Sequence, residues 1–137
     1  MTFLSEMVDR VEALTGYVEG TNVFTYELPN EPDVCVVLKD GPGQDSDQGF
    51  GQQGAMFETP SLFVTVRGAR PGAGVADEVT TPAGKIDTIY RGLTRVATTL
   101  GTTFYHWIQP IGSPHYVGRD ENGRRLWALS LLAKRVP

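Results

Sequence analysis

The stretch YVGRDENGRRLWALSLLAKRV, residues 116–136, carries the strongest fold signal in the sequence. Asn122-Gly123 is the dipeptide most typical of a type I′ hairpin turn, because both central residues of that turn need a positive φ. After this turn, successive residues of 125–136 fall alternately on two faces, and one face has the bulky apolar residues Trp127, Leu129 and Leu131. Such alternation indicates a strand. The stretch therefore predicts a β-hairpin whose second strand is long.

The segments before this hairpin show helix and strand patterns in turn. Apolar spacing predicts a helix over residues 2–14, between Thr2 as N-cap and Gly16 as C-cap, and a second helix from Thr81, its N-cap, to about residue 100, where Gly101 ends it. Strand patterns cover residues 22–28, 34–38, 61–69 and 102–108. The order α-β-β-β-α-β-β-β predicts one α+β domain over residues 1–137, with a mixed, mostly antiparallel β-sheet packed by two α-helices.

One long segment, residues 39–60, is rich in Gly, Gln, Asp and Ser and has almost no apolar periodicity. Its glycines lack the spacing of a phosphate-binding loop, and its acidic residues do not match a calcium-binding EF-hand. Loops of this length without secondary structure are uncommon in compact domains unless they are functional or disordered. We therefore expect a long mobile loop at about residues 39–60, which orders against a partner or lines a channel.

Charge is unevenly distributed along the chain. The formal net charge is −4, but residues 1–60 hold 11 acidic and 2 basic residues, a net charge of −9, and residues 61–137 hold 5 acidic and 10 basic residues, a net charge of +5. The two halves can interleave in the fold as ordinary solvated faces. Alternatively, an acidic face of one subunit meets a basic face of the next, a contact that can close into a ring.

Residues suited to catalysis or metal binding are sparse. Cys35 lies within an apolar strand pattern and is expected to be a buried hydrophobic residue, and His106 is expected to pack against its aromatic neighbours across strands. His115 lies in a loop, where local hydrogen bonding is the preferred interpretation, although a hydrolase or transferase built on His115 and Asp120 is conceivable. We expect no enzymatic activity, no cofactor and no bound metal ion.

The sequence also has no apolar run of the roughly 18 residues that a membrane span needs. Its start, MTFLSEMVDR, lacks the basic region of a signal peptide. A single Cys excludes an internal disulfide. These features predict synthesis in the reducing cytoplasm of a host cell and no membrane partner.

The hairpin sequence Tyr116 to Arg124, followed by the apolar strand, resembles the last hairpin of small phage head–tail joining proteins, that is, tail terminators and the minor capsid proteins grouped with them. The remaining pattern is similar too: a first helix that ends at Gly16-Tyr17, a strand that closes on Leu28-Pro29, the apolar run 34–38, and residues 60–67 ahead of the second helix. The resemblance implies a virion subunit that forms a homohexameric ring, caps the tail tube, ends tail polymerisation and docks the tail to the head connector protein. DNA would pass through the lumen without being read. The resemblance brings no catalytic motif.

Basic side chains of the second half and the polar loop are the candidates for the contacts of such a ring. The candidate interface residues are Arg91, Arg95, Arg119, Arg124, Arg125, Asp45, Asp47 and Phe50. Two other functions stay open at this point: a head-completion or connector-stopper protein of the phage neck, and a generic intracellular binding module.

Overall fold

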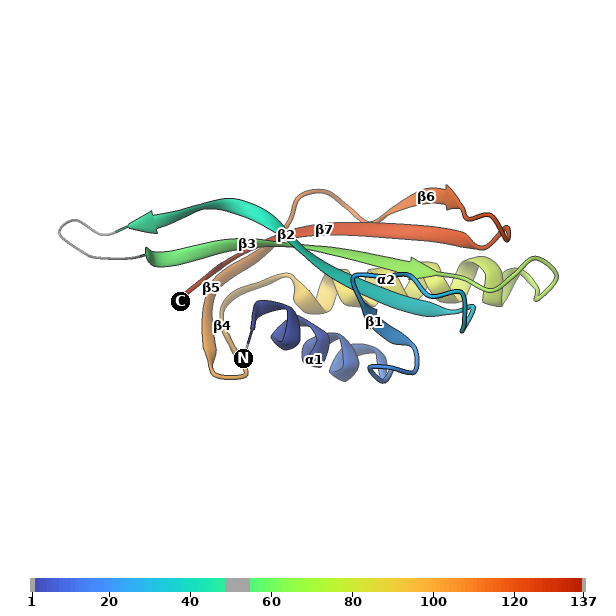
Figure 1. The fold of residues 1–137 in the computed structure, drawn as a ribbon, viewed down its shortest axis with the longest axis horizontal. Coiled ribbons are helices and arrows are strands. Elements are labelled where there is room, and N and C mark those ends of the chain that lie inside the picture. The colour runs from blue at the N-terminus through green and yellow to red at the C-terminus, as the bar shows by residue number, and fades with distance from the viewer. Residues whose placement is uncertain (1, 49–54, 137) are drawn as a thin grey trace.

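A computed structural model describes residues 2–48 and 55–136, which form two α-helices and a seven-stranded curled sheet (Figure 1). The elements in chain order are α1 (Phe3–Thr15), β1 (Val23–Thr25), β2 (Cys35–Gln48), β3 (Ala55–Arg67), the π-helical turn η1 (Ala76–Thr80), α2 (Thr81–Leu93), β4 (Arg95–Leu100), β5 (Thr103–Pro110), β6 (His115–Arg119) and β7 (Arg125–Arg135). The strand order is β1-β2-β3-β7-β5-β4, and β6 pairs with β7 on the same side as β5. Of the strand pairs in the described residues, only β1–β2 is parallel. The predicted α+β class with a mixed, mostly antiparallel sheet and two helices is confirmed.

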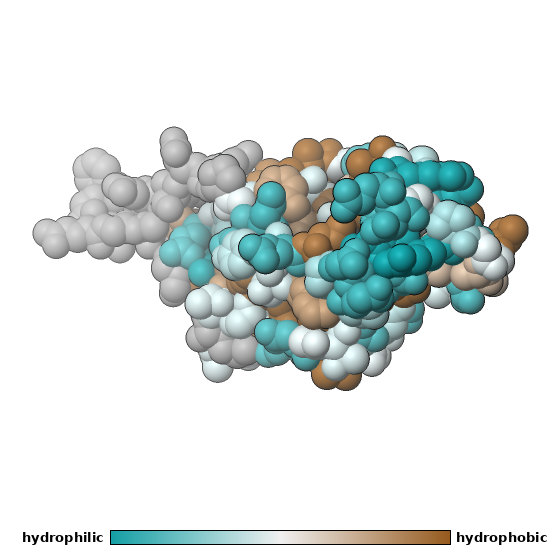
Figure 2. All heavy atoms as spheres, turned by 45° about the vertical axis from the view of Figure 1, so that its right-hand side comes forward, coloured by the Kyte–Doolittle hydropathy of each residue, from teal (hydrophilic) through white to brown (hydrophobic). Residues whose placement is uncertain are grey.

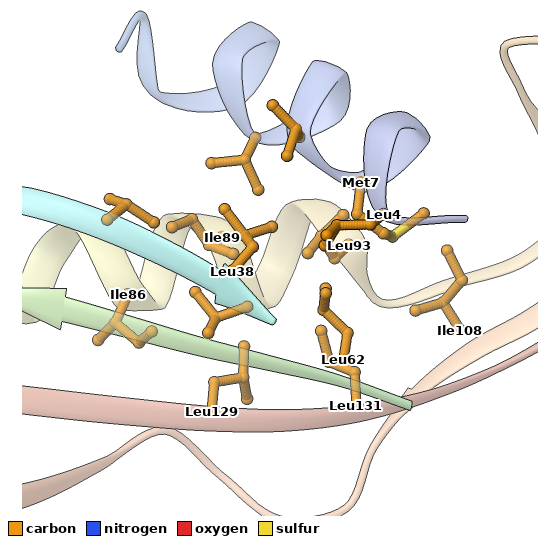
Figure 3. Close-up of a cluster of buried hydrophobic side chains, with 14 of the residues drawn as sticks. Leu4, Met7, Leu38, Leu62, Ile86, Ile89, Leu93, Ile108, Leu129 and Leu131 are labelled. Atoms are coloured by element: carbon orange, nitrogen blue, oxygen red, sulfur yellow. The ribbon is translucent and has the colours of Figure 1, made fainter. Parts of the chain in front are cut away.

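Both helices pack on one face of the sheet and bury a single apolar core against it (Figure 3). Alternation along β3 and β7 sends one set of side chains toward the helices and the other set toward the outer face. The inward set and the apolar stripes of the helices include Leu4, Met7, Leu38, Leu62, Ile86, Ile89, Leu93, Leu129 and Leu131, all buried. No helix of residues 2–48 and 55–136 covers the outer face of the sheet.

The first helix follows its sequence signals. The Thr2 side chain accepts a hydrogen bond from the Ser5 backbone N–H, 3.1 Å away, and thereby caps the start of α1. Gly16 ends the helix in the left-handed conformation, with φ of 75°. Both caps of α1 are confirmed, and the predicted bounds of 2–14 differ from the observed Phe3–Thr15 by one residue at each end.

The predicted start of the second helix is confirmed, because α2 begins at Thr81 with Pro82 in its first turn, but the predicted N-cap and C-terminal end are wrong. The chain is already helical in η1, so Thr81 lies inside the helical segment and makes no N-cap. At the other end, Thr94 is extended, with ψ of 107°, and residues 95–100 form β4, which pairs with β5. The β-branched run in RVATTL favours a strand over the last turns of a helix, and Gly101, with φ of 61°, turns the chain into β5 rather than capping a helix. The observed order of elements therefore has one strand, β4, that the predicted order lacks.

The expected loop at 39–60 is corrected in its structure. Residues 39–48 continue β2 and residues 55–60 begin β3, and the two strands pair antiparallel with register shifts between Gly41 and Gln44 and again around Asp47. Backbone pairing needs no apolar periodicity, and this explains why the sequence pattern missed it. The paired segment projects beyond the helices at one end of the molecule (Figure 1). The mobility of this segment stays a prediction.

Two smaller predictions also need correction. The strand expected over residues 22–28 is β1, which ends at Thr25 because Tyr26 takes a positive φ of 69°. The β6–β7 hairpin is confirmed, but its turn is not type I′. Gly123 alone has a positive φ (77°), and its N–H donates to the Asp120 carbonyl 3.0 Å away, as in a type I turn followed by a left-handed bulge residue.

Candidate assembly surface

The tip of the β6–β7 hairpin is fixed to the segment before β2 by two buried arginines. Arg124 is 2% exposed, and its guanidinium lies 2.8 Å from Oδ2 of Asp120, 3.0 Å from Oδ1 of Asp33 and 2.6 Å from the Asn30 carbonyl. Arg67, 1% exposed, donates to the carbonyls of Asp33 and Pro32 at 2.8 and 2.6 Å. This end of the molecule comes forward in Figure 2, where hydrophilic side chains form a broad patch.

The Asp carboxylates of this cluster are shifted toward the charged form. The hydrogen bond from Arg70 lowers the pKa of Asp33 against the opposing effect of burial, and Arg124 lowers it further. Burial alone would raise the pKa of Asp120, but hydrogen bonds from the backbone and side chain of Arg124 outweigh it and leave that pKa lowered. The cluster is thus a set of compensated charges inside one subunit. Arg124, a candidate for an intersubunit contact, is buried and binds partners within its own subunit.

The β6 edge of the sheet is open. β6 pairs with β7 on one side, and no strand lies along its other side among the described residues. Tyr116 and Val117 on this strand are 50% and 56% exposed, unusually high values for large apolar side chains in a sheet. Arg119 is exposed and Arg125 is partly buried, and together with Tyr116 they line a shallow, open depression of the surface. Within the described part of the chain, neither arginine is paired with an acidic side chain.

A second open surface lies on the outer face of the sheet. There the residues that follow β1 lean over β2, β3 and β7 and enclose a mainly apolar groove of about 320 Å³. Tyr26, Leu28 and Phe63 are exposed apolar residues of this groove. A hydrogen bond to Asp40 raises the pKa of Tyr26, whose positive φ is rare for an aromatic residue. Sequence patterns miss this groove, because it joins the turn after β1 to three strands, of which β3 and β7 are distant from that turn in the sequence.

The other interface candidates lie apart from one another. Arg91 is exposed on α2 and pairs with Asp87, 2.9 Å away, while the Arg95 side chain donates to the Gly92 carbonyl at 3.1 Å. Asp45 and Asp47 belong to the outer part of β2, and Phe50 lies outside the described residues. The structure therefore brings Arg119 and Arg125 together, and separates Arg91 and Arg95 from both of them.

The residues considered for catalysis lie in structural positions. His115 Nδ1 is 3.3 Å from the Ser113 carbonyl, and Asp120 is bound within its own hairpin. His106 packs edge-on against Phe57 and Phe104, with ring centroids 4.6 and 5.1 Å apart. Cys35 is fully buried, and burial raises the pKa of its thiol. The predicted local bonding of His115, packing of His106 and burial of Cys35 are confirmed, but His115 is the first residue of β6 and does not lie in a loop. Residues 2–48 and 55–136 contain no group of three or more potential metal ligands and no helix long and apolar enough to cross a membrane.

Comparison with known proteins gives the family. Residues 9–137 match the sequence profile of bacteriophage tail terminator proteins. The chain belongs to this family. The match covers nearly the whole domain, including the hairpin and long strand from which the fold was first inferred. None of the curated proteins matches the chain in sequence.

Solved structures share the fold of this tail terminator family member. A chain from the virion of a native gene transfer agent particle superposes with a TM-score of 0.64 at 16% identity, over 98% of this chain and 95% of its own. A second solved chain has a TM-score of 0.54 at 14% identity, over 97% of this chain and 89% of its own. Family membership makes the protein a structural, virion-associated tail component. The family resemblance seen in the sequence is confirmed.

Proposed function

We propose that this tail terminator forms a homohexameric ring that caps the tail tube, ends tail polymerisation and docks the tail to the head connector protein. The observation that carries the proposal is the family match over residues 9–137. The protein would be made in the host cytoplasm and act in the virion, at the junction of tail and neck. It would act without enzymatic activity or a cofactor.

Two features of the surface support a ring. A closed ring of identical subunits needs two different contact surfaces on each subunit. The β6 edge and the outer part of β2 lie at opposite edges of the sheet, and within the described residues each is unpaired along one side. The groove beside Tyr26 and Phe63 adds apolar surface that a neighbour or a tail protein could cover.

The acidic first half of the chain supports a lumen through which DNA passes. Residues 1–60 have a net charge of −9. A surface with few free basic groups neutralises few phosphates, so DNA would slide past it without being held.

Electron microscopy of the isolated protein and of purified virions tests the proposal. We expect rings with a central hole, and the subunit at the head-proximal end of the tail. Finding the subunit on tail-less heads would instead favour a head-completion or connector-stopper protein. Its absence from purified virions would contradict a virion role of either kind.

A further inference from the structure

The two open edges of the sheet match each other in strand direction and in charge. We propose that the free edge of β6 pairs antiparallel with the outer part of β2, residues 39–48, in a second copy of the chain. The inference rests on the proposed ring and names the contact that would build it.

Outer β2 and β6 both have backbone groups without a strand partner among the described residues. β1 covers β2 only at residues 36–38, and the Tyr26 N–H donates to the Leu38 carbonyl at the end of that pairing. Beyond Leu38, no strand of the described residues lies along this side of β2. β6 is likewise paired on one side only. Each edge therefore presents unpaired N–H and C=O groups of the kind that bind an added strand.

The chain directions of β6 and β2 favour antiparallel pairing between copies. β2 and β7 run parallel to each other because both are antiparallel to β3, and β6 is antiparallel to β7. β6 consequently runs opposite to β2. Copies related by rotation about an axis near the strand direction keep these directions, so β6 of one copy meets β2 of the next as an antiparallel pair.

β6 and residues 39–48 of β2 lie at different levels along the sheet within one subunit. Through the registers Tyr116↔Trp127, Trp127↔Val66 and Val66↔Val36, β6 lies level with the part of β2 that β1 already covers. Residues 39–48 lie further along the strand. The proposed pairing thus requires strands tilted relative to the ring axis, which is the usual arrangement in closed sheets.

Charge selects a second copy as the occupant of the β6 edge. This edge carries Arg119 and Arg125 without acidic partners among the described residues, next to the exposed apolar surface of Tyr116. Residues 39–48, KDGPGQDSDQ, contain three aspartates and one lysine. A strand with this sequence brings negative charge to the two free arginines, and a partner with the opposite charge pattern would be repelled.

Charge reversal tests the contact. One variant carries Arg119→Glu and Arg125→Glu, and the other carries Asp45→Lys and Asp47→Lys. For each variant alone, like charges face each other across the contact, and we expect the apparent dissociation constant for assembly, measured by light scattering, to rise about a hundredfold. In an equimolar mixture, each β6 edge again meets an oppositely charged β2, so rings should return. The rescue also shows that both variants are folded.

Arg91→Glu is the matched control, because it makes the same change of charge on α2, away from both edges, and should leave ring formation unchanged. Rings from either double variant alone, no rescue on mixing, or loss of rings with Arg91→Glu would overturn the contact and leave the proposed ring intact. A wild-type chain that forms no ring would contradict the ring itself, and this contact with it. If a double variant unfolds, Arg119→Glu and Asp45→Lys provide the same mixing test.

Discussion

Nη1 of Arg124, at the tip of the β6–β7 hairpin, lies 3.0 Å from Oδ1 of Asp33, in the segment that leads into β2. These residues are 91 positions apart in the sequence. Their contact closes one end of the sheet, because it ties the hairpin that ends the chain to the turn that follows β1. A buried guanidinium that loses its partners, or carboxylates that lose their guanidinium, would be left with uncompensated charge.

Arg124→Met should therefore lower the free energy of unfolding by about 3–5 kcal/mol, the range for breaking a buried ion pair. Urea unfolding at a protein concentration below assembly measures it. Arg119→Met is the matched control, since Arg119 is exposed and has no ion pair among the described residues, and should change stability by less than about 0.5 kcal/mol. Equal stabilities of the two variants would contradict a structural role for the cluster.

Acid should weaken the same cluster. The folded pKa values of Asp33 and Asp120 are lowered from 3.8, so their stabilising contribution is complete above that value and is lost as the pH falls through the folded pKa values. We expect the free energy of unfolding to fall below about pH 4, and to fall less steeply in Asp33→Asn, which is already less stable at pH 7. Urea unfolding at pH 7 and pH 3 checks this. The same pH slope in variant and wild type would show that Asp33 contributes nothing to acid sensitivity.

Apolar periodicity and helix caps made part of the fold predictable from the sequence. Thr2 and Gly16 bound α1 as expected, because a cap is a local interaction between residues a few positions apart. The change from α2 to β4 depends instead on pairing with β5, for example Arg95 opposite Ile108, a partner 13 positions later that a helical stripe cannot reveal.

The candidate site was less predictable for the same reason. Arg119 and Arg125 could be selected from charge near a turn signal, but Arg124, in the same hairpin, faces inward toward Asp33. The alternation of strand residues does not extend reliably into a turn with a bulge. Only the fold shows which of the three hairpin arginines is buried.

A buried pair joins the first helix to β5. The Tyr105 hydroxyl donates to Oε1 of Glu6 at 2.7 Å, and Arg135 donates to the same oxygen at 3.3 Å. Burial and the Glu6 carboxylate raise the pKa of Tyr105, so its hydroxyl stays a donor. Oε2 of Glu6 is buried without a hydrogen-bond partner in the described structure, so this carboxylate depends on its two donors.

Tyr105→Phe should cost about 1–3 kcal/mol, because it leaves a buried carboxylate with one donor fewer while keeping the aromatic ring. Thermal and urea unfolding of the variant measure the loss. Tyr90→Phe is a suitable control, as no hydrogen bond of the Tyr90 hydroxyl is present among the described residues, and it should be close to neutral. A neutral Tyr105→Phe would mean that water replaces the hydroxyl at Glu6.

Two glycines of α2 provide a test of how closely the helices pack. A Cβ added at Gly92 would overlap Cδ1 of Leu14 in α1, whereas a Cβ at Gly84 would meet nothing within 4 Å. Gly84→Ala should stabilise the protein by about 0.5–1 kcal/mol through helix propensity. Gly92→Ala brings the same propensity gain but forces Leu14 out of its packed position, and overpacking of this kind costs about 1–3 kcal/mol. We therefore expect opposite shifts of the unfolding midpoint in urea. Equal stabilisation by both substitutions would show that Leu14 can turn away at no cost, and that α1 and α2 are held together by the rest of the core.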